Sequence, residues 1–263
     1  MDMSLKGKRA FVCGASRGIG RAVAHELALL GASVILLARD AQALDEAVAS
    51  LPTSEEQSHQ ALALDMYNEA LLIHSVNNLV DNLGAIHILV NNTAGPASGT
   101  LVDSDVDSLA KAFKNHIVIS HHLMHAFQPG MRTEGYGRII NIVSTSVKQP
   151  IEGLGVSNTI RGAMASWSKT LATELGQYGI TVNNVLPGAT ETERLTSIIS
   201  GRAAKTGATL ADVRLEMLRE IPAGRFASPF EIANAVAFLA SPAAAYINGT
   251  NILVDGGRTR ALS

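Results

Sequence analysis

The sequence contains little of what marks a secreted, membrane-spanning or nucleic-acid-binding protein. Its 263 residues include one cysteine, Cys13, which excludes an internal disulfide and fits a reducing compartment. A formal net charge of −2 gives no general field for nucleic acid or an anionic membrane. Apolar runs such as residues 235–240 are far shorter than the roughly 20 residues that span a bilayer, and the first residues lack the apolar core of a signal peptide. We therefore expect a cytoplasmic protein without nucleic-acid or membrane partners.

Aromatic residues are also scarce, at 4%, although 47% of the residues are hydrophobic. A core of Ala, Val, Ile and Leu suits parallel strands that are buried on both faces. Short apolar runs alternate with helical patterns along the chain, and we predict strands at Arg9–Cys13, Ser33–Ala38, Ala61–Leu64, Ile86–Val90, Arg138–Val143, Thr181–Leu186 and Asn251–Val254. Such β-α-β alternation predicts a doubly wound Rossmann fold, with a seven-stranded, mainly parallel sheet and helices on both faces.

The chain shows no internal repeat and no linker-like change of composition, so residues 1–263 are predicted to form one domain. One stretch departs from the alternation of strands and helices. Thr190–Glu220 is polar and helical and has no strand of its own. We interpret residues from about 190 to 220 as a lid inserted over the site.

A glycine-rich turn follows the first predicted strand and leads directly into a helix. Its sequence, Gly14-Ala-Ser-Arg-Gly18-Ile-Gly20, places three glycines where dinucleotide phosphates need close backbone approach and donors at a helix N-terminus. The alternative is an ordinary tight turn, which the strand before it and the helix after it argue against. We predict a nicotinamide dinucleotide site.

The end of the second predicted strand bears on which nicotinamide is bound. A carboxylate there would accept from a ribose 2′-hydroxyl, whereas a guanidinium would pair with a 2′-phosphate. This sequence has Ala38 followed by Arg39, and Arg17 lies within the phosphate loop. We therefore predict that NADP(H) is preferred over NAD(H). The alternative is that both arginines are simply solvated surface residues.

Several ordered motifs together identify a family resemblance. The Gly14–Gly20 spacing, Asn91-Asn-Thr-Ala-Gly95 after the fourth strand and Asn183-Asn-Val-Leu-Pro-Gly188 after the sixth resemble the short-chain dehydrogenase/reductase family. Gly224-Arg-Phe-Ala-Ser-Pro229 and Asp255-Gly-Gly257 resemble its bacterial 3-oxoacyl-carrier-protein reductase branch. The resemblance covers nearly the whole chain.

The resemblance implies a set of cofactor contacts. Asp65 is expected at the adenine, Asn91 on the adenosine side, and Thr192 at the nicotinamide carboxamide or a phosphate. The loop at Thr93 is one residue longer than the usual motif of the family. The predicted cofactor-binding residues are Gly14, Ser16, Arg17, Gly18, Ile19, Gly20, Arg39, Asp65, Met66, Asn91, Thr93, Ala94, Pro187, Gly188 and Thr192. No metal site is predicted.

The catalytic motif of the family is altered at its two most diagnostic positions. In the family a Ser precedes the proton-donating Tyr by 13 residues, and a Lys follows that Tyr by four. Here the Ser corresponds to Ser144, while Ser157 stands in place of Tyr and Arg161 in place of Lys. An aliphatic hydroxyl is far less acidic than a phenol, and an arginine does not transfer protons near pH 7. Arg161 keeps a positive charge that, with Ser144, can stabilise an alkoxide.

Three interpretations follow from this change. The first is a working reductase whose proton comes from a water held by Ser157 and Arg161. The second is a catalytically weak NADP(H)-binding regulator or subunit partner. The third is an enzyme that uses another acid for different NADP chemistry. We favour the first, acting on a small carbonyl or alcohol substrate.

A long helix around residues 105–128 provides further candidates. Asn115 resembles the family's helix Asn, which organises a catalytic water, although a hydrogen bond within the helix is the alternative. His122, seven residues later, is a candidate to support the site. The His121–His125 spacing could suit a metal, but packing or interface roles are favoured. The family branch further implies a homotetramer, with the small residues Gly162, Ala163 and Ala165 at a helix interface.

Overall fold

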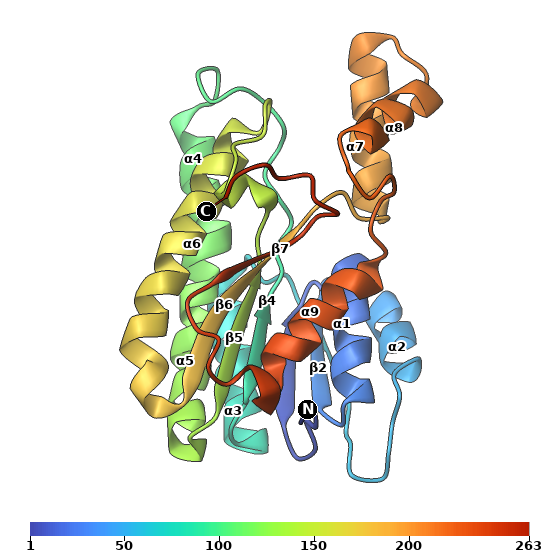
Figure 1. Ribbon diagram of the computed structural model, residues 1–263. Coiled ribbons are helices and arrows are strands. Elements are labelled where there is room, and N and C mark those ends of the chain that lie inside the picture. The colour runs from blue at the N-terminus through green and yellow to red at the C-terminus, as the bar shows by residue number, and fades with distance from the viewer. Residues whose placement is uncertain (263) are drawn as a thin grey trace.

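A single parallel sheet organises the molecule in the computed structural model, which describes residues 1–262 (Figure 1). The strand order is β3-β2-β1-β4-β5-β6-β7, and every neighbouring pair is parallel. The strands are β1 (Arg9–Cys13), β2 (Ser33–Ala38), β3 (Gln60–Ala63), β4 (Ile88–Asn91), β5 (Gly137–Ile142), β6 (Ile180–Pro187) and β7 (Asn251–Val254). The predicted Rossmann-type fold is confirmed. Three strands coincide with their predicted bounds, and the others differ by one or two residues at an end.

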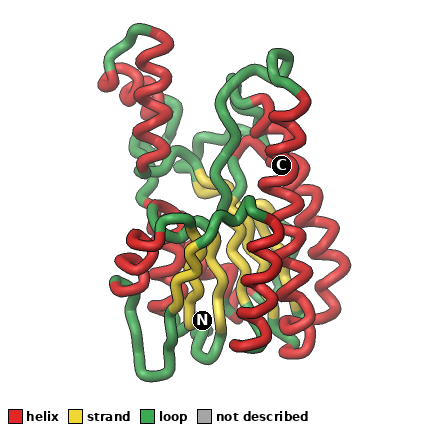
Figure 2. The backbone as a smooth tube through the Cα atoms, turned by 180° about the vertical axis from the view of Figure 1, so that it is seen from behind, coloured by secondary structure: helices red, strands yellow, loops and turns green. Residues whose placement is uncertain are grey.

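Helices cover both faces of the sheet (Figures 1 and 2). One face carries α1 (Gly18–Leu29), α2 (Ala41–Ala49) and α9 (Pro229–Ala240). The other carries α3 (Glu69–Leu83), α5 (Ile119–Glu134) and α6 (Gly155–Leu175), with α4 (Val106–Phe113) packed on α6. Short helical turns complete the chain: η1 (Lys114–Val118, a π-helical turn), η2 (Thr145–Val147), η3 (Gly176–Tyr178) and η4 (Pro242–Ala244).

The apolar strands bury side chains on both sides, as the composition suggested. Along β1, Ala10 and Val12 pack into the core on the α1 and α9 side, and Phe11 and Cys13 into the core on the α5 side. Successive strand residues point to opposite faces, so a strand covered twice must be apolar throughout. Cys13 is fully buried, and burial raises the pKa of its thiol to about 12, so it packs as a small hydrophobic residue.

Two helices stand beyond the carboxyl ends of the strands, α7 (Glu193–Thr206) and α8 (Leu210–Arg219) (Figure 1). They form a small core of their own, which includes Leu195, Ile199 and Val213. One β-bridge, between Thr190 and Ala227, joins the chain segment that leads into these helices to the segment that leads out of them. These helices occupy the predicted insertion, and its role as a lid stays a prediction. No helix within residues 1–262 has both the length and the apolar composition needed to cross a membrane.

A row of asparagines crosses four neighbouring strands beneath the carboxyl edge of the sheet. Asn91 Nδ2 donates to Asn141 Oδ1 at 2.8 Å, Asn141 Nδ2 to Asn184 Oδ1 at 3.0 Å, and Asn184 Nδ2 to Asn251 Oδ1 at 2.8 Å. The residues are direct partners in the strand register. Buried amides need such partners, and the row supplies them across the sheet. The side chain of Asn91, which was expected on the adenosine side of the cofactor, belongs to this row, and its contact with a cofactor stays a prediction.

Candidate active site

One large cavity lies where the strand order reverses, between the carboxyl ends of β1 and β4. Open α/β sheets bind their ligands at this switch point. The cavity measures about 2670 Å³, several times the roughly 300–1,000 Å³ of an ordinary small-molecule pocket. It extends from the glycine-rich loop past the ends of β5 and α6 to α7. This volume accommodates a dinucleotide together with a substrate.

The glycine-rich loop forms one end of the cavity. Gly14 has a φ of +60° and Gly18 a φ of +56°, a backbone region that favours glycine. A Cβ on Gly20 would stand 2.1 Å from the carbonyl oxygen of Gly14, so only glycine allows this turn to close. Helix α1 begins at Gly18, and its first N–H groups therefore face a loop without side-chain bulk. This cradle fits a dinucleotide diphosphate.

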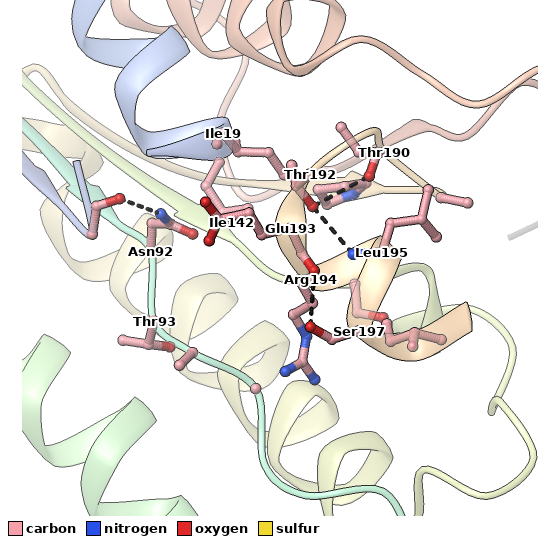
Figure 3. Close-up of a pocket in the computed structure, with 18 of the residues that line it drawn as sticks. Ile19, Asn92, Thr93, Ile142, Thr190, Thr192, Glu193, Arg194, Leu195 and Ser197 are labelled. Atoms are coloured by element: carbon pink, nitrogen blue, oxygen red, sulfur yellow. Dashed lines mark hydrogen bonds between the residues drawn. The ribbon is translucent and has the colours of Figure 1, made fainter. Parts of the chain in front are cut away.

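The start of α7 reaches across to this loop. Thr192 caps α7 by accepting a hydrogen bond from Leu195 N, and its Cγ2 would lie 3.3 Å from a Cβ on Gly18. Figure 3 shows Thr192 and Ile19 side by side over the cavity. Arg17 Nη1 forms an ion pair with Glu193 in the same region, both side chains being exposed. The predicted cation of the phosphate loop thus already shares its charge with a carboxylate.

The end of β2 supplies the other predicted cation of the cofactor site. Arg39 is exposed, lines the cavity and has no carboxylate partner within residues 1–262. The neighbouring Asp40 is engaged in capping α2, where its side chain accepts from Ala43 N at 3.1 Å. Tyr67 also lines the cavity near Arg39, and burial raises the pKa of its phenol. An uncompensated guanidinium at this place fits a 2′-phosphate.

The far wall of the cavity contains the three residues at the positions of the family's catalytic motif, two of which differ from that motif. Ser144 follows β5 and accepts a hydrogen bond from Ser146 N at 3.1 Å, which fixes its side chain at the start of η2. Ser157 and Arg161 lie on the first turns of α6 and are 9% and 8% exposed. They are four residues apart, so they project from the same face of the helix. The structure brings together the residues that the motif spacing predicted.

Arg161 occupies an unusual electrostatic environment. Its Nη1 donates to Ile142 O at 3.0 Å, whereas its buried Nε has no hydrogen-bond partner within residues 1–262. Burial, with the charge of Arg194 as the second cause, lowers the pKa of the Arg161 guanidinium to about 10. The group therefore remains charged at neutral pH, and no carboxylate of residues 1–262 forms an ion pair with it. Such a charge is costly to bury unless a ligand or water satisfies it.

A buried histidine stands beside this charge. His116, in the π-helical turn η1, is hydrogen-bonded through Nδ1 to Thr93 Oγ1. Burial and the charge of Arg161 lower the pKa of His116 to about 3, so the ring is neutral at physiological pH. The contact uses Thr93, in the loop that is one residue longer than the usual motif. This pair was not anticipated from the sequence.

The remaining residues of the long helix lie away from the cavity. Asn115 is half-buried within η1 but does not line the cavity, and its predicted role with a water stays a prediction. His122 was expected to support the site, and instead its Nε2 pairs with Glu69 of α3 at 3.0 Å. His121 and His125 contact one another at 3.1 Å. The described residues contain no cluster of three or more His, Cys, Asp or Glu that could hold a metal ion.

Most of the predicted site residues line this one cavity. They are Gly14, Ser16, Arg17, Gly18, Ile19, Arg39, Asp65, Met66, Thr93, Ala94, Ser144, Ser157, Arg161, Pro187, Gly188 and Thr192. Gly20 acts beneath it by closing the turn, and Asn91 and Asn115 lie outside it. The cavity is also lined by residues that were not predicted, and Tyr67 and Arg194 are the two of these that bear on its charge. Each follows a predicted contact by two positions, Asp65 and Thr192 respectively, which is the signal that could have found them.

Comparison with known proteins agrees with this arrangement. Residues 14–259 match the family model described as enoyl-(acyl carrier protein) reductase. The chain is 35% identical to the 3-oxoacyl-[acyl-carrier-protein] reductase FabG of Vibrio harveyi, over 97% of this chain and 98% of the relative. It is 30% identical to gluconate 5-dehydrogenase of Gluconobacter oxydans, over 98% and 97%.

Solved structures show the same relationship. L-sorbose reductase from Gluconobacter frateurii, in complex with NADPH and L-sorbose, aligns with a TM-score of 0.92 at 32% identity over 100% of both chains. YwfH, an NADPH-dependent reductase involved in bacilysin biosynthesis, aligns with a TM-score of 0.90 at 28% identity over 97% and 99%. The chain belongs to the short-chain dehydrogenase/reductase family. It is accordingly an NAD(P)-dependent oxidoreductase acting on an alcohol or carbonyl group. The homotetramer stays a prediction.

Proposed function

We propose that this protein is an NADPH-dependent reductase that converts a small carbonyl compound to an alcohol through Ser144, Ser157 and Arg161. The observation that carries the proposal is the convergence of these three side chains on one cavity wall, opposite a glycine cradle suited to a diphosphate. When bound, the reduced nicotinamide supplies the hydride. What the chain must supply is orientation, charge stabilisation and a route for a proton.

The preference for NADP(H) is supported by Arg39. Its guanidinium follows β2 directly and has no carboxylate partner in the described part of the chain, so it is available to a 2′-phosphate. Arg17 contributes less because Glu193 shares its charge. L-sorbose reductase and YwfH, both similar to this chain, are described with NADPH.

The proton route follows from the replaced residues. Ser157 is shorter than a tyrosine, which leaves space beside Arg161 for a water molecule. The Ser144 hydroxyl donates to the carbonyl oxygen and polarises it, while the Arg161 guanidinium stabilises the developing alkoxide. The water held by Ser157 and Arg161 donates a proton to that oxygen, and the hydroxide that remains takes up a proton from the solvent. Arg161 itself acts by charge, because it does not release a proton near pH 7.

Two measurements in sequence test this proposal. Fluorescence titration with NADPH and NADH establishes binding, and single-turnover mixing of the NADPH complex with a panel of ketones, aldehydes and oxo acids establishes hydride transfer. We expect binding and oxidation of NADPH by at least one carbonyl class. Binding without oxidation by any compound would contradict the proposal and support a cofactor-binding regulator or subunit partner.

A further inference from the structure

Two guanidinium groups converge at the substrate side of the cavity. Arg161 Nη2 and Arg194 Nη2 lie 3.8 Å and 2.9 Å from the point where a Cβ on Gly95 would stand. Gly95 lacks that atom, and its absence leaves room for Arg194. Figure 3 shows Arg194 extending from the start of α7 toward the segment that follows Thr93. Two elements far apart in sequence, α6 and α7, thus direct cations to one place.

No carboxylate of residues 1–262 forms an ion pair with either group, in contrast to three other arginines of the same cavity. Arg17 pairs with Glu193, Arg202 with Glu216 at 2.9 Å, and Arg258 with Glu220 at 2.6 Å. The polar neighbours identified around Arg161 do not neutralise its charge. His116 is uncharged because burial and Arg161 lower its pKa to about 3, and Tyr67 is uncharged because burial raises the pKa of its phenol.

The two arginines also differ in how deeply they are buried. Arg161 is 8% exposed and held through Nη1 by Ile142 O, so its orientation is fixed, while its Nε lacks a partner within residues 1–262. Arg194 is exposed on α7. A fixed, buried charge and an exposed one that converge on an open space are arranged to hold an anion between them, since the unpaired buried charge of Arg161 is unfavourable without one.

We propose that Arg161 and Arg194 bind a carboxylate of the substrate, so that the carbonyl compound reduced by this protein is an oxo acid. The inference rests on the proposed function and specifies its substrate class. Arg161 lies one helical turn from Ser157 and shares the cavity wall with Ser144. A carboxylate held by Arg161 therefore lies close to the carbonyl that Ser144 polarises. The arrangement suits a 2-oxo or 3-oxo acid.

Binding and turnover are measured with matched ligands. Isothermal titration calorimetry of the NADP⁺-loaded protein compares 4-phenylbutanoate with 4-phenylbutan-1-ol, which lacks the charge. Steady-state reduction compares 2-oxo-4-phenylbutanoate with 4-phenylbutan-2-one, in which a methyl group replaces the carboxylate. We expect the carboxylate to bind at least about tenfold more tightly than the alcohol, and kcat/KM to favour the oxo acid by a similar factor.

Arg194→Gln tests the site, and Arg202→Gln is its matched control, because Arg202 lines the same cavity from the same helix but is paired with Glu216. Arg194→Gln should weaken 4-phenylbutanoate binding by about tenfold and lower the oxo-acid-to-ketone ratio of kcat/KM accordingly. Arg202→Gln should change neither value by more than about twofold.

Two results would overturn the inference. One is equal affinity of the unmodified protein for the carboxylate and the alcohol. The other is a loss of NADP⁺ affinity in Arg194→Gln with carboxylate binding unchanged, which would assign the pair to the phosphates of the cofactor. The calorimetric comparison decides the inference even if no carbonyl is reduced, whereas the absence of all reduction would refute the proposed reductase.

Discussion

The two ends of the cavity are built differently. Beside β1 and α1, glycine residues leave room for a ligand because they have no side chain, whereas the end beside α6 and α7 is lined by charged side chains. Gly14, Gly18 and Gly20 form the first end, and their positions are fixed by backbone geometry. Arg161 and Arg194 define the second, and their positions depend on packing between distant segments. The first end follows the family pattern and the second departs from it. A fold can therefore keep its cofactor machinery while the residues that act on the substrate change.

The largest effect is expected from a substitution that disrupts the glycine-rich turn at the cofactor end of the cavity. In Gly20→Ala the new Cβ would stand 2.1 Å from Gly14 O, a clash with backbone that the turn must open to relieve. We expect NADPH affinity to fall at least about 100-fold and the free energy of unfolding to fall by about 3 kcal/mol. Fluorescence titration and urea denaturation measure the two. Gly201→Ala, a helical glycine on α7 with nothing within 4 Å, is the control and should leave affinity within about twofold. Similar behaviour of the two variants would contradict the cradle.

The next effect tests the altered substrate end. Arg161→Ala removes both the charge and a water ligand, so turnover should fall by about one to two orders of magnitude in single-turnover assays. Ser157→Ala should cost less because the water keeps other partners. The exposed Lys169 on the same helix provides a control in Lys169→Ala, which should retain activity.

The combined variant Ser157→Tyr with Arg161→Lys sharpens the same point. It recreates the family's pair on one helical turn and should raise the rate on simple ketones, while its ring would reduce the space for the natural substrate. If an established activity survived Ser144→Ala, Ser157→Ala and Arg161→Ala unchanged, the assignment of this site would be wrong.

A third effect concerns pH and the neutral histidine beside Arg161. His116 has a pKa of about 3 in the folded protein and an ordinary value of 6.5. Between these values the unfolded chain binds a proton that the folded protein does not, so stability falls as pH falls. Its contribution should amount to about 1.6 kcal/mol between pH 6.5 and 5, because the slope rises toward roughly 1.4 kcal/mol per pH unit only as the unfolded imidazole becomes fully protonated. Urea denaturation at several pH values measures how the free energy of unfolding falls with pH. This fall should be smaller in His116→Gln than in the unmodified protein. His74 is exposed on α3, and His74→Gln serves as the control that should leave the fall unchanged. A profile for His116→Gln that matches the unmodified protein would be inconsistent with this assignment.

The smallest expected effect concerns the choice between NADPH and NADH at the cofactor end of the cavity, and Arg39 is the residue that it tests. NADPH should bind at least about tenfold more tightly than NADH, about 1.4 kcal/mol, because the exposed Arg39 guanidinium at the end of β2 would pair with a 2′-phosphate. Arg39→Ala should remove most of that difference, and Arg17→Ala less, since Glu193 already shares the charge of Arg17. Paired fluorescence titrations measure the ratio. Equal affinities in the unmodified protein would refute the cofactor preference.

The fold was predictable because local patterns determine it. Runs such as Ala10–Cys13 are apolar at every position, which only a doubly covered strand requires. The predicted site residues also converged, since the ends of parallel strands meet at one edge. Asn91 shows what the local pattern did not reveal. Its register with Asn141 makes its side chain part of a buried row, while its contact with a cofactor stays a prediction.

By itself, the sequence determined the sheet, the glycine cradle and the loss of the tyrosine and lysine, because each is encoded in a contiguous pattern or a fixed spacing. Only the tertiary structure decided which charges remain unpaired. Four arginines of this cavity are the same residue type, yet two of them have carboxylate partners and two lie beside Gly95 without one among residues 1–262. The first two are Arg17 and Arg202, and the second two are Arg161 and Arg194. Charge compensation depends on distances between segments that are remote in sequence, and a Coulomb interaction changes greatly over a few ångströms in a buried site. That distance dependence is why the substrate end had to be seen in three dimensions.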